Sequence, residues 1–201
     1  MGTLSVTAKN AAAQAVADLC THAGLFGVTA ISGTTGTASS NVFSKTAHGL
    51  VDGDAVLLTA LTGGSGLTAG NASNANGAAK VYFVISAATD TFKLSADSGG
   101  SEVDFTTDIS AVTVNKVTEL TGGSPAYARQ ALSKNAASAG AVSLSNTPVF
   151  DVPASSTIGA VGYHTAASAG SRHGIDGVVF ETFAAQGTYT LTSGTISASN
   201  L

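Results

Sequence analysis

The amino-acid sequence predicts a mainly β protein: a β-sandwich or jelly-roll-like domain with one N-terminal α-helix and one inserted small antiparallel β module. Three observations favour this fold class. Short runs of β-branched and aromatic residues recur along most of the chain. Clusters of Gly, Pro, Asn and Asp separate these runs at a spacing typical of β proteins. The residue composition changes near residue 41 and changes back near residue 115, which indicates an insertion.

The first element is an alanine-rich helix over residues 7–22. The apolar residues that recur near the helical period are Ala12, Val16, Leu19 and Cys20. Gly24 is placed to end this helix. The run LFGVTAIS, residues 25–32, then predicts a strand, and GTTGTASS, residues 33–40, is typical of a flexible connector. We place the first domain boundary in this connector.

Residues 41–115 predict a compact antiparallel β module. The runs AVLLTAL, KVYFVIS and TFKLS are strand-like, and the turn signals VDGD, ATD and DSGG separate them. A loop rich in Gly, Asn and Ala covers residues 63–79. Because both ends of the module lie beside turn-like segments, it can be inserted into a surface loop at a modest cost in closure entropy.

The chain after Val117 continues as strands. The strand-like runs are AYARQALS, AVSLSN, PVFDVPA, TIGAVGYHTA, GVVFETFAA and GTYTLTSGTISAS. Their spacing fits a sandwich or jelly roll better than alternating βαβ units. Residues 1–40 and 116–201 are therefore expected to form one discontinuous β-sandwich domain around the 41–115 insertion.

The composition restricts the possible function. Charged residues make up 10% of the 201 residues, against roughly 25% in average domains. Such a chain is poor in the ionisable groups that a catalytic pocket brings together. The net charge is -4 and the eight basic residues are spread singly, so no basic stripe is available for nucleic acid. We expect a protein that is not an enzyme, needs no cofactor and binds no nucleic acid.

The cysteine count and the N-terminus indicate the cellular context. Cys20 is the only cysteine, which excludes an intrachain disulfide, and its place on an apolar helix face predicts a small core residue. The N-terminal residues MGTLSVTAKNAAAQ lack the pattern of a signal peptide. No window approaches the about 18 uninterrupted apolar residues of a membrane span. We expect synthesis in the cytoplasm and no membrane contact.

The stretch TGGSPAYARQAL, residues 121–132, could be a loop that binds an anion or a tight turn into a strand. It lacks the lysine of a phosphate-binding loop, and Pro125 removes an N–H group where one would be needed. Gly-Gly-Ser recurs at residues 63–65 and 99–101, each time between expected strands. The repeated turn chemistry favours a turn.

Five residues of this stretch are candidates for a structural or assembly role: Gly122, Gly123, Pro125, Tyr127 and Arg129. The glycines and the proline are expected to set the turn. Tyr127 and Arg129 are expected to begin the strand and to alternate on one face. Arg129 could pair with Glu119 or Glu181 across the sheet, or reach a neighbouring subunit, and we favour a structural ion pair.

Other candidate chemistry is weak. The four histidines, His22, His48, His164 and His173, show no HxH or HExxH spacing, so we expect polar residues at strand ends. A metal site at His164, His173 and Asp176 stays an alternative. No GxSxG elbow surrounds any serine, and Gly63–Gly66 is expected to be a loop tip. Asp52 and Asp54 are expected to be solvated acids in a turn. No catalytic, cofactor-binding or metal-binding residue is predicted.

Several stretches carry a family resemblance. AKNAAAQAVADL, LFGVTAIS, ELTGGSPAYARQAL, PVFDVPASSTIGAVGYHTAASAG and ETFAAQGTYTLTSGTIS resemble small virion proteins of tailed phages that infect actinobacteria. That family is described as tail-fibre-like, minor tail or capsid-associated proteins. The resemblance covers the N-terminal helix and residues 117–201. The insertion, with TAHGLVDGDAVLL, VYFVISAATDTFKLS and SGGSEVDFT, is similar to a β module that recurs in phage tail and capsid-surface proteins.

The resemblance implies a virion structural protein that is assembled in the host cytoplasm. We expect a capsid decoration protein on the outer surface of the head. Its partners would be the major capsid protein and other copies of itself in a homo-oligomer such as a trimer, with the insertion facing outward. The alternative is a minor tail or tail-fibre-like protein, bound to other tail proteins, whose insertion contacts glycans on the host surface.

Overall fold

The computed structural model describes residues 4–70 and 80–197. Strands make up 49% of the chain and helices 9%, so the prediction of a mainly β protein with one α-helix is confirmed. The last part of the predicted Gly/Asn/Ala loop, residues 71–79, lies outside the described residues. The described elements are α1 (Val6–Leu19), β1 (His22–Thr37), η1 (Ala38–Ser40), β2 (Val42–Ser44), β3 (Ala55–Gly63), β4 (Val81–Ile85), β5 (Thr91–Ser95), β6 (Ile109–Glu119), β7 (Gln130–Ala131), β8 (Ala141–Ser143), β9 (Val149–Val152), β10 (Ser156–His164), β11 (Arg172–Phe183), β12 (Gly187–Thr190) and β13 (Thr195–Ser197).

The helix α1 is closed at both ends by side chains. Ser5 is its N-cap and accepts a hydrogen bond from the N–H of Ala8 at 3.2 Å. At the other end the Lys134 ammonium donates to the carbonyls of Ala17 and Cys20, at 2.6 and 2.9 Å. The Ala17 carbonyl also accepts from the C-cap N–H of Cys20 at 2.9 Å, and the Cys20 carbonyl lies past the end of the helix, so Lys134 adds a positive charge that stabilises the C-terminus of α1.

The helix is shorter than the prediction, because it ends at Leu19 and the chain turns directly into β1. Gly24 does not end the helix. It lies in β1, so the prediction of a C-terminal stop at this residue is wrong. Cys20 is a free cysteine and is buried in the core, as predicted.

Strand β1 runs for 16 residues and passes through the predicted connector. Residues 34–37 pair with β2 or β6, so the prediction of a flexible connector is wrong there. Two features favour the strand. Thr34, Thr35 and Thr37 are β-branched, and Gly36 lets β1 approach β6 closely. A Cβ atom on Gly36 would lie 2.8 Å from Cδ1 of Ile109.

The inserted region forms a closed six-stranded antiparallel barrel together with β1. The strand order is β1-β2-β5-β4-β3-β6, and pairing of β1 with β6 closes the circle. Its interior contains Phe43, Leu50, Val56, Leu58, Tyr82, Val84, Phe92, Leu94, Phe105, Ile109, Val112 and Val114. A sequence that predicts short strands does not predict this closure, because closure depends on pairing between segments far apart in the chain.

The rest of the protein is built on the first half of β1. In this half β1 pairs with β10, and β10 pairs with β11. One face of this sheet packs on α1 and on two separate two-stranded ribbons, β9–β12 and β8–β13. The core between these layers contains Ala13, Ala17, Cys20, Ala23, Leu25, Val142, Phe150, Val152, Ile158, Val161, Tyr163, Leu191 and Ile196.

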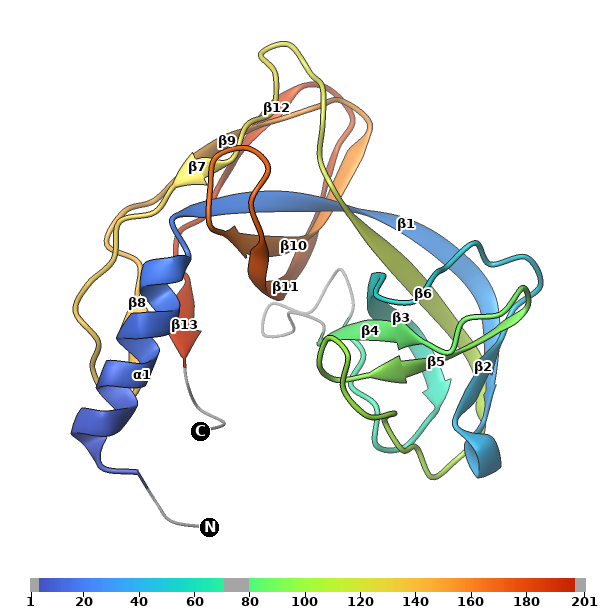
Figure 1. The fold of residues 1–201 in the computed structure, drawn as a ribbon. Coiled ribbons are helices and arrows are strands. Elements are labelled where there is room, and N and C mark those ends of the chain that lie inside the picture. The colour runs from blue at the N-terminus through green and yellow to red at the C-terminus, as the bar shows by residue number, and fades with distance from the viewer. Residues whose placement is uncertain (1–3, 71–79, 198–201) are drawn as a thin grey trace.

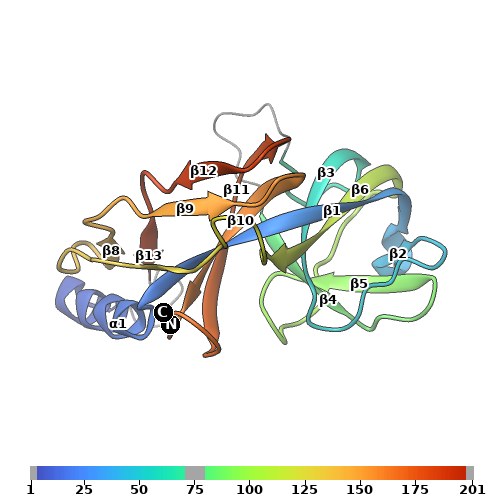
Figure 2. The ribbon, with the colours of Figure 1, turned by 90° about the horizontal axis from the view of Figure 1, so that it is seen from above.

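A third core joins the barrel to the other face of the sheet. It contains Phe26, Ala55, Leu57, Val81, Val117 and Ala160. Figure 1 shows α1 at one end of the molecule, the barrel at the other, and β1 running from one to the other; Figure 2 shows the same arrangement from above. β1 therefore belongs both to the barrel and to the rest of the protein. Residues 41–115 do not form the barrel alone, because β1, which precedes them in the chain, is one of its six strands.

Candidate functional site

The stretch singled out in the sequence lies where the chain leaves β6. Residues 123–126 form a turn, and the peptide bond before Pro125 is cis. Gly122 and Gly123 have φ angles of 80° and 92°, a left-handed backbone that residues with a side chain rarely adopt. The N–H of Tyr127 donates to the carbonyl of Gly122 at 2.7 Å. The glycines and the proline thus form the turn that the sequence predicts.

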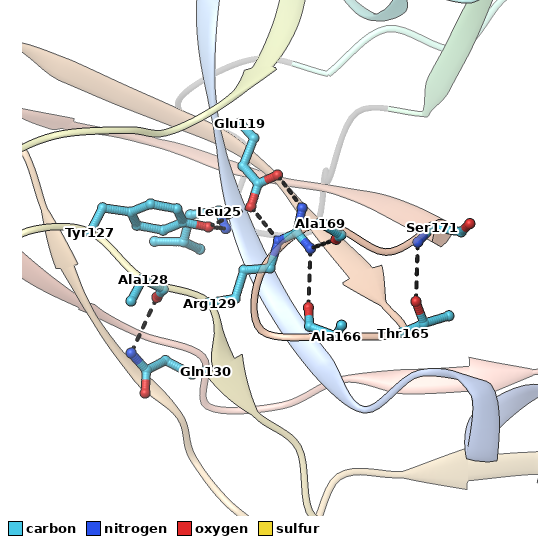
Figure 3. Close-up of polar contacts among 10 residues, drawn as sticks. All are labelled: Leu25, Glu119, Tyr127, Ala128, Arg129, Gln130, Thr165, Ala166, Ala169 and Ser171. Carbon is cyan, nitrogen blue, oxygen red and sulfur yellow. Dashed lines mark hydrogen bonds and ion pairs between the residues drawn. The ribbon is translucent and has the colours of Figure 1, made fainter.

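Tyr127 and Arg129 do not begin a strand, contrary to the prediction. Strand β7 begins at Gln130 and has two residues. The segment before it is held by its side chains instead, because the Tyr127 hydroxyl and the Arg129 guanidinium both bind Glu119. Figure 3 shows the two side chains directed toward this carboxylate from the same segment.

The Tyr127 hydroxyl fills a gap beside β1. At Leu25 the neighbour of β1 changes from β7 to β6, and the chain between these strands loops away. The carbonyl of Leu25 still accepts from the N–H of Leu120 at 3.0 Å. Its N–H donates to the Tyr127 hydroxyl at 2.8 Å, and this hydroxyl donates to Glu119 at 3.2 Å. A side chain therefore replaces the missing strand contact. Burial, and then the charge of Glu119, raise the pKa of Tyr127, so the hydroxyl keeps its proton.

Arg129 forms a two-point ion pair with Glu119. Its Nε lies 2.6 Å from one carboxylate oxygen and its second terminal nitrogen 2.7 Å from the other. The remaining terminal nitrogen donates to the carbonyls of Ala166 and Ala169, at 3.0 and 2.6 Å. Arg129 thereby ties the end of β6 to the loop between β10 and β11 (Figure 3). The expected structural ion pair is confirmed, with Glu119 rather than Glu181 as the partner.

Both partners of the pair are largely shielded from water. The side chains of Arg129 and Glu119 are 13% and 25% exposed. Burial by itself would raise the pKa of Glu119, but the hydrogen bonds and charge of Arg129 hold this pKa below its ordinary value. The hydrogen bond to Glu119 raises the pKa of Arg129. Glu119 is therefore a carboxylate at neutral pH, and its oxygens are occupied by arginine and tyrosine donors.

Two glycines make room for this cluster. Gly24 of β1 and Gly162 of β10 are partners in the strand register. A Cβ atom on Gly24 would lie 2.9 Å from a Glu119 oxygen and 3.2 Å from Nε2 of His164. On Gly162 it would lie 2.5 Å from the Phe26 ring. The bare backbone of these glycines is the surface on which the polar groups and the ring lie.

His164 is a buried histidine whose ring makes no hydrogen bond to any described residue. It is 3% exposed, and within the described chain neither ring nitrogen has a partner. Its ring stacks on Phe26, with centroids 5.9 Å apart and an interplanar angle of 7°. Burial, aided by the charges of Arg129 and Arg172, lowers the pKa of His164 to about 4, although Glu119 acts in the opposite direction. The ring is therefore neutral at pH 7.

The alternative metal site is not assembled. His164 lies on the face of the sheet that carries Phe26, whereas Asp176 and Tyr163 hydrogen-bond on the opposite face. His173 is exposed at an irregularity in β11. Among residues 4–70 and 80–197, no group of three or more His, Cys, Asp or Glu side chains could hold a metal ion.

The Gly-Gly-Ser stretches and the acids of the barrel stabilise turns. Residues 63–65 and 99–101 lie at turns, as predicted. Asp52 accepts from the N–H of Ala87 at 2.7 Å, and Asp54 forms an ion pair with Lys116 at 2.7 Å. These carboxylates are thus turn acids, as expected, but they bind protein groups and are not merely solvated.

Sequence reasoning found Tyr127, Arg129 and the partner Glu119, but it did not find Gly24, Gly162 or the burial of His164. A glycine inside a strand is a signal for a close approach of another group. Both glycines lie within runs that predict strands, so this signal was present in the sequence. Their pairing across β1 and β10 was not, because it depends on the register.

The cluster works as a cross-link among four segments: β1, the end of β6, the residue 127–129 segment and the β10–β11 loop.

None of the helices in the described part of the chain is long and apolar enough to cross a membrane. Comparisons of the chain with protein-family models, with curated proteins and with solved structures found no match.

Proposed function

We propose that the chain is a non-enzymatic structural protein of a tailed-phage virion, and that it decorates the outer surface of the head as a homo-oligomer. The resemblance of the N-terminal helix and of residues 117–201 to small virion proteins supports the place in the virion. The structural observation that carries the assembly role is an apolar surface on α1, at the end of the molecule opposite the barrel (Figure 1).

The outer face of α1 is unusually apolar for an exposed helix. Leu19 is 51% exposed and Val16 is 37% exposed, and the neighbouring Ala11 and Ala15 are exposed as well. Leu4 and Val6 are further exposed apolar side chains at the N-terminal end of the helix, at 41% and 65%. These four large side chains are a majority of the seven exposed large hydrophobic residues in the described chain. Such a concentration is typical of a contact surface.

We assign this surface to a second copy of the chain. The outer face has small side chains along its middle, which let two helices approach closely. The exposed Asp18 beside Leu19 accepts a hydrogen bond from the Gln14 amide at 2.9 Å, and no charged residue lies between Ala11 and Val16, so a largely apolar helix face is the complement that it requires. A closed oligomer built through α1 leaves every barrel at the outside, where the insertion is proposed to face.

The finer description of the fold belongs to the same proposal. Outside the barrel, the β11–β10–β1 sheet faces the β9–β12 and β8–β13 ribbons across the first core. We interpret these layers as the sandwich-like part that holds the shell or its neighbours. Many weak contacts of this kind, repeated over the copies on a particle, add up through multivalency.

The alternative proposal is a minor tail or tail-fibre-like protein. The barrel lies at the far end from α1, so it could equally reach a host surface (Figure 2). Glycan binding by the barrel would require exposed aromatic rings. Tyr82 and Phe92 are each only 1% exposed, which argues against this role, and Phe83 is partly exposed.

Copy number tests the two positions. Purified particles of the phage that encodes the chain would be digested, and the chain would be quantified by mass spectrometry against labelled peptides, with the major capsid protein as the internal reference. Decoration predicts on the order of hundreds of copies on an icosahedral head, in fixed ratio to the capsid protein. A handful of copies per particle would overturn decoration and support the tail.

A further inference from the structure

A cleft lies between the barrel and the edge strand β11. Its volume is about 540 Å³, within the range of about 300–1,000 Å³ that is usual for small-ligand sites. One wall is the first half of β11, from Arg172 to Gly177. The other wall is the start of β4 with the turn after β5, residues 96–98. The site cluster around Glu119 and Arg129 is not part of this lining.

Arg172 is the group in this cleft that most needs a partner. Its side chain is half-buried, and its guanidinium lies 5.4 Å from the centroid of the Phe26 ring. Burial lowers the pKa of Arg172, although the charge of Glu119 acts in the opposite direction. Within residues 4–70 and 80–197, no carboxylate forms an ion pair with it and no group accepts a hydrogen bond from it. A partly desolvated guanidinium binds an oxyanion strongly, because two N–H groups can donate to it at once.

The other lining groups define the rest of the ligand. Val81, Phe83 and Ile175 come from the apolar core between barrel and sheet, so they give the cleft an apolar floor. Lys80 adds a second cation at the rim, with its ammonium 5.2 Å from the centroid of the Tyr82 ring. The opposite turn supplies Asp97 and Ser98, which accept hydrogen bonds from hydroxyl groups.

We propose that this cleft binds a carboxylate-bearing sugar, an acidic monosaccharide or the same unit within a glycan chain. The carboxylate would pair with Arg172 and Lys80. One face of the ring would lie on the Phe83 side of the floor, and ring hydroxyls would donate to Asp97 and Ser98. This inference goes beyond the proposed structural role and holds for a position on the head or on the tail.

A zwitterion such as an amino acid fits the cleft less well. Its ammonium group would have to be selected by Asp97, which is exposed, and ion pairs in water contribute little free energy. A hydroxylated ring, in contrast, uses both the apolar floor and the acceptors of the turn.

The test is a titration of the full chain, observed by backbone amide NMR, with D-glucuronate as the probe. D-Glucose serves as a ring without a carboxylate, acetate as a carboxylate without a ring, and γ-aminobutyrate as a zwitterion. We expect glucuronate to shift the amides of Gly174 and Ile175 with a Kd on the order of millimolar. Glucose, acetate and γ-aminobutyrate should bind at least about tenfold more weakly.

Variants locate the site. Arg172→Gln should weaken glucuronate binding about tenfold, and Lys80→Gln, which changes an exposed side chain and keeps the fold, about threefold. Lys45→Gln removes the same charge outside the cleft and should leave the Kd unchanged. Three outcomes would overturn the proposal. Glucuronate could shift no amide up to tens of millimolar, or acetate or γ-aminobutyrate could bind as tightly as glucuronate. The third outcome is that Lys80→Gln and a folded Arg172→Gln both bind glucuronate with the native Kd.

Discussion

Arg129 holds Glu119 through two hydrogen bonds of 2.6 and 2.7 Å, and the same guanidinium binds two carbonyls of the β10–β11 loop. This pair connects the last residue of the barrel to a hairpin of the other part of the protein. Its loss would leave the Glu119 carboxylate with only the Tyr127 hydroxyl as a donor, and two backbone carbonyls without the guanidinium donor. An unpaired, partly buried charge costs more than the ion pair itself contributes.

The first prediction concerns this pair. Arg129→Ala should lower the free energy of unfolding by about 2 kcal/mol, measured by chemical denaturation. The matched control is Lys93→Ala, which breaks the Lys93–Glu102 pair, whose side chains are 28% and 43% exposed. An exposed pair contributes little, so this control should lose clearly less stability than Arg129→Ala. Equal losses in both variants would contradict a special role for Arg129.

The Tyr127 hydroxyl should be required for the order of β1 at Leu25. Tyr127→Phe removes the acceptor of the Leu25 N–H, so stability should fall by about 1–2 kcal/mol and the Leu25 amide should exchange faster with solvent. Tyr189→Phe is the control, because no hydrogen bond to the Tyr189 hydroxyl is found within the described chain. If the Leu25 amide exchanges equally slowly in Tyr127→Phe, the hydroxyl does not replace a strand contact.

The sequence was sufficient for the mainly β class, the helix, the order of the strands after residue 117 and the turn at Gly122 and Gly123. These features depend on residues close together in the chain. The closed barrel was not predictable in the same way, because β1 pairs with β6 only after the whole insertion has folded back. The site shows the same limit: Tyr127 and Arg129 were visible, but the paired glycines under them depend on the register of β1 and β10.

Those glycines give a steric prediction. Gly24→Ala would place a Cβ atom 2.9 Å from Glu119 and 3.0 Å from the Tyr127 hydroxyl, so stability should fall by about 2 kcal/mol in thermal or chemical unfolding. Gly174→Ala, in the same sheet, is the control. The nearest atom to its new Cβ would be a Tyr163 ring carbon at an ordinary 3.4 Å, so little change is expected. A tolerated Gly24→Ala would show that the cluster can move aside.

His164 predicts a loss of stability in acid. The native ring has a pKa of about 4, below the ordinary value of about 6.5, so between these values the unfolded chain binds a proton that the native chain does not. Stability must then rise with pH across this window and fall as the pH is lowered from 7 to 4, by up to about 3 kcal/mol. The lowered pKa of Glu119 adds a further loss in the same direction at lower pH.

Urea denaturation at pH 7, 6, 5 and 4.5 would measure this dependence. His164→Phe keeps a ring on Phe26 and removes the titrating group, so its stability should change less between pH 7 and 5 than that of the native chain. His173→Asn removes an exposed histidine and should keep the native slope. A native chain whose stability does not change between pH 7 and 4.5 would rule out a buried neutral His164.

The exposed face of α1 predicts how copies associate. Leu19→Glu places a charge within the proposed contact, at the C-terminal end of α1, where a second copy would have to bury it unpaired, so the oligomer should dissociate to monomers in light scattering after size exclusion. The side chain points to solvent in the isolated chain, so the melting temperature of the monomer should change little. Val51→Glu makes the same substitution at a valine that is 61% exposed, in the loop before β3, and should leave the oligomer intact. If the native chain is monomeric at high concentration, or if both variants remain oligomeric, copies do not associate through α1, whereas dissociation of Leu19→Glu alone assigns the contact to this helix.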